Sequence, residues 1–160
     1  MKYNRTAKKQ KQSFGRGAQV IPFRTKMRRK DADVVFIPIV GTQKQLASAA
    51  YLASVADQSF EGRMIAEQAL LVAGSIEVPE KAKLIPLTVT SFTSGIEYSG
   101  KVLRKGSLFG LEKWLDDTGT EVQKRVLVLV DEISVRGDRA FLVVDETRVI
   151  GVICIKRRSI

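Results

Sequence analysis

The sequence predicts an α+β domain in which about six antiparallel strands form one sheet and two pairs of helices pack on it. Three observations support this fold class. The predicted elements follow one another as a strand, two helices, three strands, two helices and two strands. Glycines stand at several of the predicted ends, where they allow the chain to turn. Apolar residues make up 44% of the chain, which is enough to fill one core.

The first half of the predicted domain contains one strand and two helices. Residues 34–40 are mostly apolar, and Gly41 ends this predicted strand. Thr42 has the side chain of a good N-cap, so we predict a helix that starts there and runs through residue 56. Residues 57–60 break the helical pattern. A second helix is predicted at residues 61–73, with Gly74 at its end and a loop around Pro79.

The second half contains five predicted strands and two predicted helices. Ser99-Gly100 has the composition of a two-residue hairpin turn. The helix predicted at residues 121–135 contains alternating valines, which are also typical of a strand. Cys154 lies in an apolar run, so we expect a buried, inert thiol. The strands are predicted at residues 84–90, 95–98, 102–104, 139–145 and 148–155, and the first of the two helices at residues 107–115.

Basic residues concentrate at the N-terminus. Residues 1–30 hold eleven Lys or Arg and no acidic residue, whereas the other sixteen basic residues and all seventeen acidic residues follow. The net charge of +10 therefore belongs to this arm. We predict a basic arm at residues 1–33, disordered on its own because its apolar residues are few and show no period, and one domain at residues 34–160. The arm can be a solvated extension, a contact for nucleic acid or an anionic membrane, or a targeting peptide.

Several functional classes lack the residues they need. The chain has no histidine and one cysteine, so an internal disulfide is impossible and the commonest metal ligand is missing. No Gly-x-x-x-x-Gly-Lys-Ser/Thr motif occurs, which argues against a Walker-type hydrolase. No apolar run approaches the roughly 20 residues of a transmembrane helix. We expect no metal ligands, no catalytic residues and a cytoplasmic protein.

Lys105-Gly106-Ser107 stands between a predicted strand and a predicted helix. Gly106 lets a ligand approach the backbone, Ser107 can cap the helix, and the free N–H groups at a helix start attract anions. Lys105 adds a mobile positive charge. The pattern is compatible with nucleotide binding, and also with an ordinary strand-to-helix turn that binds nothing.

Two longer motifs resemble one protein family. They are Ala-Ser-x-Ala-Asp-x-x-x-Glu-Gly-Arg at residues 53–63 and the Ser-Gly-Ile and Arg-Lys-Gly-Ser pair at residues 94–96 and 104–107. With these motifs, residues 35–156 resemble the nucleotide-binding (N) domain of the catalytic B subunit of the Kdp-type potassium-transporting P-type ATPase. The resemblance implies an antiparallel sheet with helix pairs. The family's Asp-Lys-Thr-Gly-Thr phosphorylation motif is absent, so we expect no phosphate acceptor in this chain.

The resemblance implies a set of nucleotide-binding residues. Ser94 and Gly95 match the family's serine near the nucleotide and the glycine that leaves room for it. Lys105 matches a lysine that lies close to the adenine and the phosphates, with Gly106 beside it. An acidic loop at the opposite rim of the pocket corresponds to Asp57, Glu61 and Gly62.

The adenine-stacking position departs from the family. The family has a phenylalanine seven residues before Ser94, where this chain has Leu87. Aromatic stacking on a base is worth about 1–3 kcal/mol, or roughly a five- to 150-fold change in affinity. Phe92 and Phe60 are the candidate replacement rings, and each can instead be a packed or exposed aromatic without a ligand. Arg63 is expected to be structural, pairing with a nearby carboxylate.

Two functions from different classes remain open. The first is an ATP-binding domain that holds ATP weakly and does not hydrolyse it alone, with Mg²⁺ entering only on the nucleotide. The second is a non-catalytic regulatory or interaction protein with a degenerate pocket, whose basic arm contacts nucleic acid, an anionic membrane or a pump. Other subunits of a potassium pump are expected partners of the first. Association with a membrane would then occur through such a partner.

Overall fold

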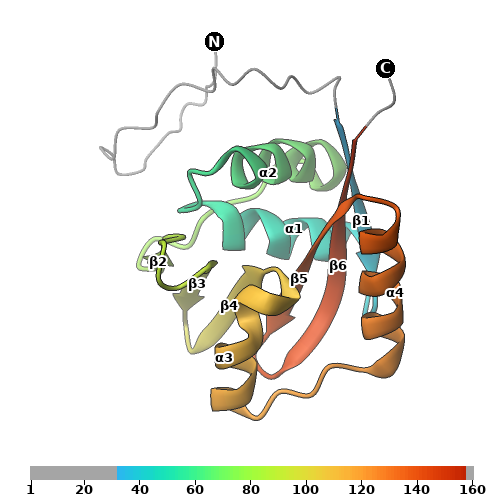
Figure 1. The fold of residues 1–160 in the computed structure, drawn as a ribbon. Helices are drawn as coiled ribbons and strands as arrows, with labels where there is room; N and C mark the ends of the chain where they lie inside the picture. The colour runs from blue at the N-terminus through green and yellow to red at the C-terminus, as the bar shows by residue number, and fades with distance from the viewer. Residues whose placement is uncertain (1–31, 158–160) are drawn as a thin grey trace.

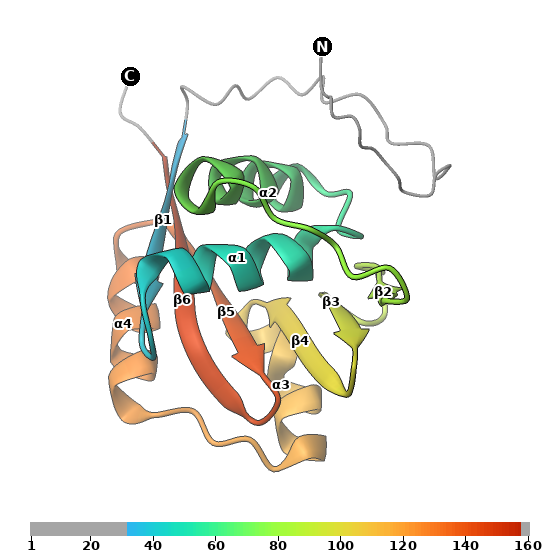
Figure 2. The same cartoon turned by 180° about the vertical axis from the view of Figure 1, so that it is seen from behind.

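The structure is a computed structural model that describes residues 32–157 of the chain. Six strands form one antiparallel sheet in the order β1-β6-β5-β4-β3-β2 (Figure 1). Helices α1 and α2 cover one face of the sheet, and α3 and α4 cover the other (Figure 2). This arrangement confirms the predicted α+β class. The elements are β1 (Ala32–Pro38), α1 (Gln43–Ser54), α2 (Phe60–Ala73), β2 (Lys83–Ile85), β3 (Thr93–Tyr98), β4 (Lys101–Gly106), α3 (Leu108–Thr118), α4 (Lys124–Val135), β5 (Arg139–Asp145) and β6 (Arg148–Arg157).

Two apolar clusters, one on each face, hold the layers together. Alternate side chains of a strand point to opposite faces, so β5 and β6 supply both clusters. Val143 and Ile153 pack with α1 and α2, whereas Leu142 and Val152 pack with α3 and α4. Cys154 is buried in the second cluster, as expected for a core thiol. β5 and β6 are therefore covered on both faces by the two helix layers.

Side-chain caps define the starts of three helices. Thr42 and Gln45 form a reciprocal capping box at the start of α1. Ser59 accepts a hydrogen bond from the Gly62 N–H at the start of α2, at 3.0 Å. Ser107 accepts one from the Gly110 N–H at the start of α3, at 2.9 Å. The predicted caps Thr42 and Ser107 are thus confirmed.

The fourth helix is confirmed despite its valines. In α4, Val126 and Ile133 are fully buried and stand seven residues apart, which is two helical turns. The predicted start at residue 121 is three residues early. The hairpin turn at Ser99-Gly100 is also confirmed, because both residues have positive φ angles, 47° and 79°, as a type I′ turn requires.

Two predicted strands are misplaced. The strand predicted at residues 84–90 ends at Ile85, because Pro86 has no N–H to donate to a neighbouring strand. The chain then turns, with the Phe92 N–H donating to the Thr88 carbonyl oxygen at 3.0 Å. The first strand covers residues 32–38 instead of 34–40, because the N–H groups of residues 39 and 40 both donate to Ile150.

The predictions about the N-terminal arm and the membrane complete the comparison. The basic arm predicted at residues 1–33 lies almost wholly outside the described residues, so its boundary with the domain stays a prediction. Among residues 32–157, no helix has both the length and the apolar character needed to cross a membrane.

Candidate functional site

A buried ion pair lies where the loop between α1 and α2 meets the sheet. Lys105 on β4 places its Nζ atom 2.6 Å from Asp57 Oδ2. Only 2% of Lys105 and 6% of Asp57 are exposed. Asp57 Oδ1 also accepts a hydrogen bond from the Ser59 N–H at 3.0 Å. The prediction of a mobile positive charge at Lys105 is therefore wrong, because the strand carries its side chain under the helix layer and Asp57 holds it there.

Burial and attraction act together on this pair. Burial lowers the pKa of Lys105, and the attraction of Asp57 limits that fall. Burial alone would raise the pKa of Asp57, but Lys105 and the hydrogen bonds from Ser59 outweigh it and lower the pKa overall. The 2.6 Å contact between Lys105 Nζ and Asp57 Oδ2 has the short length typical of a charge-assisted hydrogen bond.

Two more of the predicted residues adjoin the pair. Ser94 is directly opposite Lys105 in the sheet, and its hydroxyl donates to the Ala53 carbonyl oxygen at 2.7 Å. That hydroxyl ties β3 to the end of α1, so a nucleotide could accept its hydrogen bond only by replacing this contact. Gly62 lies against Asp57, since a Cβ there would stand 2.2 Å from the Asp57 carboxyl carbon. Glycine therefore lets the loop close over the ion pair.

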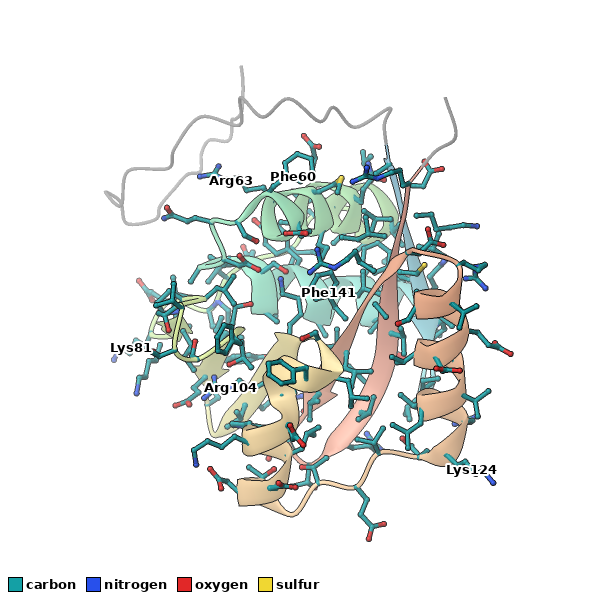
Figure 3. All side chains as sticks on the ribbon, viewed as in Figure 1. Phe60, Arg63, Lys81, Arg104, Lys124 and Phe141 are labelled. Carbon is teal, nitrogen blue, oxygen red and sulfur yellow. The ribbon has the colours of Figure 1, made fainter. Side chains whose placement is uncertain are left out.

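Glu61 belongs to a second, more exposed ion pair beside the first. Its Oε2 atom is 2.6 Å from a terminal guanidinium nitrogen of Arg139, whose side chain is 60% exposed. The Arg139 guanidinium carbon also lies 5.3 Å from the centre of the Phe141 ring. Lys105 Nζ lies 5.9 Å from the same ring. Figure 3 shows Phe141 on β5 where that strand passes α1.

Sequence reasoning missed Arg139 and Phe141. Both lie on the face of β5 that carries Val143, and Val143 pairs with Lys105 across the sheet. Their alternation along the strand was visible in the sequence. The pairing of β5 with β4 was not, and only that pairing brings them to the site.

Three other predicted residues lie on the opposite face of the sheet or at its edge. Gly95 and Gly106 adjoin the α3 side, because a Cβ on Gly95 would meet Arg104 and one on Gly106 would meet Leu111. Phe92 is 52% exposed, and its ring centre lies 6.5 Å from that of Phe109 on α3. The structure therefore does not bring Phe92 to Lys105.

The other residues near the expected base also differ from expectation. Leu87 lies in the connection after β2, not in a strand, and is 38% exposed. Phe60 is the first residue of α2 and packs partly against the core on that side. Arg63 donates from Nε to the Gln58 carbonyl oxygen at 3.3 Å, which supports a structural role. Burial lowers the pKa of Arg63, and the charge of Asp57 partly offsets this effect.

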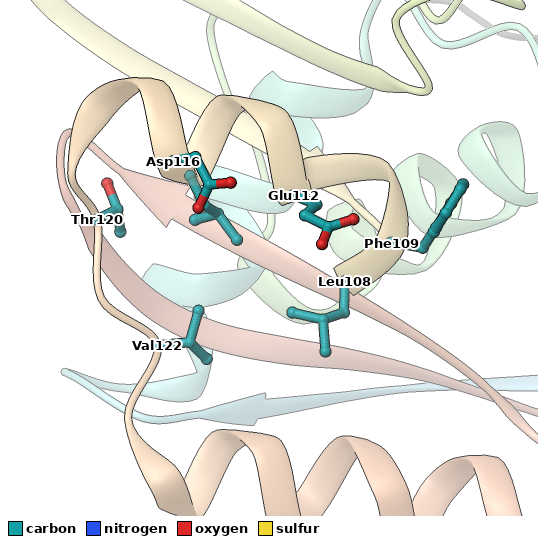
Figure 4. A pocket seen from close by; sticks show the side chains of 7 residues that line it. Leu108, Phe109, Glu112, Asp116, Thr120 and Val122 are labelled. Carbon is teal, nitrogen blue, oxygen red and sulfur yellow. The ribbon is translucent and has the colours of Figure 1, made fainter.

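Two surface pockets lie away from the ion pair. One, of about 460 Å³, borders α3 and the loop after it, with Glu112 and Asp116 on its wall (Figure 4). The other, of about 370 Å³, lies at the start of α1 and includes Gln45 and Tyr98. Neither is lined by a predicted nucleotide-binding residue. Within residues 32–157, no group of three or more His, Cys, Asp or Glu side chains could hold a metal ion.

Comparison with known sequences finds relatives among the ATP-binding subunits of potassium-transporting ATPases. The chain is 33% identical over 125 residues to the potassium-transporting ATPase ATP-binding subunit 1 of Listeria innocua, covering 76% of this chain and 18% of that protein. It is 32% identical over 128 residues to the corresponding subunit of Enterococcus faecalis, with the same two coverages. The chain thus spans about a fifth of the length of these curated relatives. No family model matches it.

Comparison with solved structures shows the fold. The N-domain of a copper-transporting P-type ATPase superposes with a TM-score of 0.57 and 15% identity, covering 74% of this chain and 94% of that one. A zinc-transporting PIB-type ATPase gives a TM-score of 0.60 and 16% identity, covering 81% of this chain and 20% of that one. By sequence and by fold, the described part of this chain therefore belongs with the N domains of Kdp-type potassium-transporting P-type ATPases.

Proposed function

We propose that this domain binds ATP weakly at the Lys105–Asp57 cluster and does not hydrolyse it on its own. The cluster consists of Asp57, Glu61, Gly62, Ser94 and Lys105. Gly95 and Gly106 support it from the opposite face of the sheet by keeping the backbone of β3 and β4 close to its neighbours. In this proposal Phe92 is not a ligand, and Leu87 is at most an apolar contact at the rim.

The buried ion pair carries the proposal. Replacing a buried ion pair with apolar residues often leaves the free energy of unfolding unchanged or raises it. Stability alone therefore does not explain why a buried ion pair is present here. Ionisable groups whose pKa values are shifted by burial and a charged partner are typical of functional sites. Here the pair lies among residues that the family resemblance assigns to the nucleotide. A phosphate or a purine nitrogen that competes with Asp57 for Lys105 would use this buried charge.

The same contacts explain why binding should be weak. Lys105 and the Ser94 hydroxyl already have partners, so the ligand must replace existing contacts rather than fill free ones. Leu87 cannot supply a ring at the position that the family resemblance assigns to the adenine, where stacking is worth about 1–3 kcal/mol. We expect a dissociation constant near or above about 1 mM, which corresponds to roughly −4 kcal/mol.

The remaining proposals follow from ATP as the ligand. Mg²⁺ would reach the site on the nucleotide phosphates. Hydrolysis would need a phosphate acceptor or a catalytic base, and the described cluster has neither a metal site nor a histidine. The domain would act in the cytoplasm, and other subunits of a potassium pump would be its partners and its connection to a membrane.

A residue-resolved titration tests the proposal. ATP added to the ¹⁵N-labelled chain should shift the backbone amide signals of Ser94, Gly95, Lys105 and Gly106. The double variant Lys105→Met/Asp57→Asn removes both charges together and should abolish these shifts. Lys113→Met, which removes an exposed lysine on α3, should leave them unchanged. Shifts confined to residues 1–30 would contradict the proposal and indicate attraction of phosphate to the basic arm.

One observation favours the second function. Val89, Phe92 and Phe109 are exposed apolar residues, and the two rings lie next to each other. An exposed apolar patch is typical of a protein contact. If ATP shifts no signal in the cluster, a regulatory or interaction protein with a degenerate pocket becomes the better proposal.

A further inference from the structure

We propose that the ring of Phe141 is the surface on which the purine base of the nucleotide stacks. This inference rests on the proposed ATP binding, and it names a residue that the family resemblance does not supply. The base would lie against a side chain of β5, beside Lys105. The stacking position expected from the resemblance, Leu87, would then play no part in affinity.

The strand pairing puts Phe141 beside the ion pair. Lys105 is opposite Val143, and Gly106 is opposite Leu142. Side chains alternate along a strand, so Phe141 is the next residue on the face that carries Val143 and Lys105. The distance of 5.9 Å from Lys105 Nζ to the ring centre confirms this placement. A base on this ring would therefore lie within reach of the lysine.

The ring already attracts flat and charged groups. Arg139 places its guanidinium over the ring at 5.3 Å. A guanidinium is planar, and the π face that holds it can also hold a base. Arg139 is otherwise held by its pair with Glu61, in which the two side chains are 60% and 30% exposed. Ion pairs in contact with solvent contribute little to stability, so a base can displace the Arg139 guanidinium from the ring at a small cost in free energy.

The other candidate rings are less suitable. Phe92 lies against Phe109 on the α3 side of the sheet. Phe60 is the first residue of α2 and, like Phe141, packs partly against the core on the α1 side. Phe141 differs in its measured contacts, because its ring centre lies within 6 Å of both Lys105 Nζ and the Arg139 guanidinium carbon. Leu87 is apolar but has no π face to stack on a base.

Titration of matched variants tests this assignment. Phe141→Leu keeps an apolar side chain and should weaken ATP binding at least five-fold, the lower end of the effect of losing a stacked ring. Binding of inorganic tripolyphosphate, which has no base, should stay within two-fold. Phe141→Tyr keeps the ring and should bind ATP like the unchanged chain. Phe92→Leu should also bind normally, and the adenine H8 proton should show a nuclear Overhauser contact with the Phe141 ring.

Each other outcome has a distinct meaning. If the unchanged chain binds ATP and Phe141→Leu binds it equally well, the stacking assignment is wrong and the proposed function stands. If Leu87→Phe tightens ATP binding while Phe141→Leu has no effect, the base lies at the position that the resemblance indicates. If Phe141→Tyr weakens binding as much as Phe141→Leu, the residue acts through packing, and the assignment fails. If the unchanged chain shows no shift at Ser94 and Lys105, both proposals fail.

Discussion

The Lys105–Asp57 pair gives a stability prediction that does not depend on any ligand. Replacing Lys105 with methionine removes the positive charge but keeps most of the apolar stem. Asp57 would then be a carboxylate with 6% exposure that has lost the cation in direct contact with it. Its remaining described hydrogen bond comes from the Ser59 N–H. The variant therefore creates a poorly compensated buried charge.

The expected loss is large because the pair is so little exposed. Removing one partner of a buried pair costs about 3–5 kcal/mol. A domain of ordinary stability has about 5–15 kcal/mol in total, so Lys105→Met should be close to unfolding. The double variant Lys105→Met/Asp57→Asn removes both charges, and the asparagine oxygen can still accept from Ser59. Its stability should return to within about 1 kcal/mol of the unchanged chain, because apolar or neutral replacement of a buried pair is often neutral.

Urea unfolding followed by far-ultraviolet circular dichroism measures these differences on the full chain. The difference between the double variant and the single variants gives the coupling energy of the pair. Lys113→Met is the matched control, since its partner Asp117 is on the surface and no measurable change is expected. The reasoning is refuted if Lys105→Met unfolds at the same urea concentration as the unchanged chain. It is also refuted if the double variant is as unstable as the single one.

Two further predictions concern the same loop. The pKa of Asp57 lies below its ordinary value of 3.8, so the charged carboxylate stabilises the fold above pH 3.8, and this contribution is lost as the pH falls through the lowered value. Acid titration of unfolding free energy should show this loss in the unchanged chain, and an equal acid slope in Asp57→Asn would contradict it. Gly62→Ala should lower the unfolding free energy by about 1–3 kcal/mol, because its Cβ would stand 2.2 Å from the Asp57 carboxyl carbon. Unchanged urea unfolding of Gly62→Ala would show that the loop is not closed over Asp57.

Local signals in the sequence predicted most of the fold. Thr42, Ser107 and the Ser99-Gly100 turn act through neighbours within a few residues, and each formed as predicted. Continuous apolar runs located β5 and β6, because both faces of those strands meet a helix layer. The strand predicted at residues 84–90 was wrong beyond Ile85, because apolar residues on both sides of Pro86 resemble a strand while the proline ends the ladder there.

The candidate site was less predictable because it is made by long-range contacts. Lys105 meets Asp57 from 48 residues away along the chain, and Arg139 meets Glu61 from 78 residues away. The family motifs pointed to Asp57, Glu61 and Lys105 without showing that the lysine would be buried. Phe141 stands in no motif. Its place depends on the register of β5 with β4, which no local pattern in the sequence fixes.

The alternation of side chains along β3 and β4 also limits which residues one nucleotide can contact. Ser94 and Lys105 face α1, so the next residue on each strand must face α3. Arg104 lies on that far side, with its guanidinium carbon 5.8 Å from the Trp114 ring centre, and the missing Cβ of Gly95 leaves room for it. A ligand held by Lys105 therefore cannot also contact the open side of Gly95. The structural reason for this glycine is close packing, because a Cβ there would stand 2.2 Å from the Leu103 carbonyl oxygen and 2.9 Å from the Arg104 guanidinium. A ligand-binding role for the site therefore has to be carried by the α1 face, where Phe141 is.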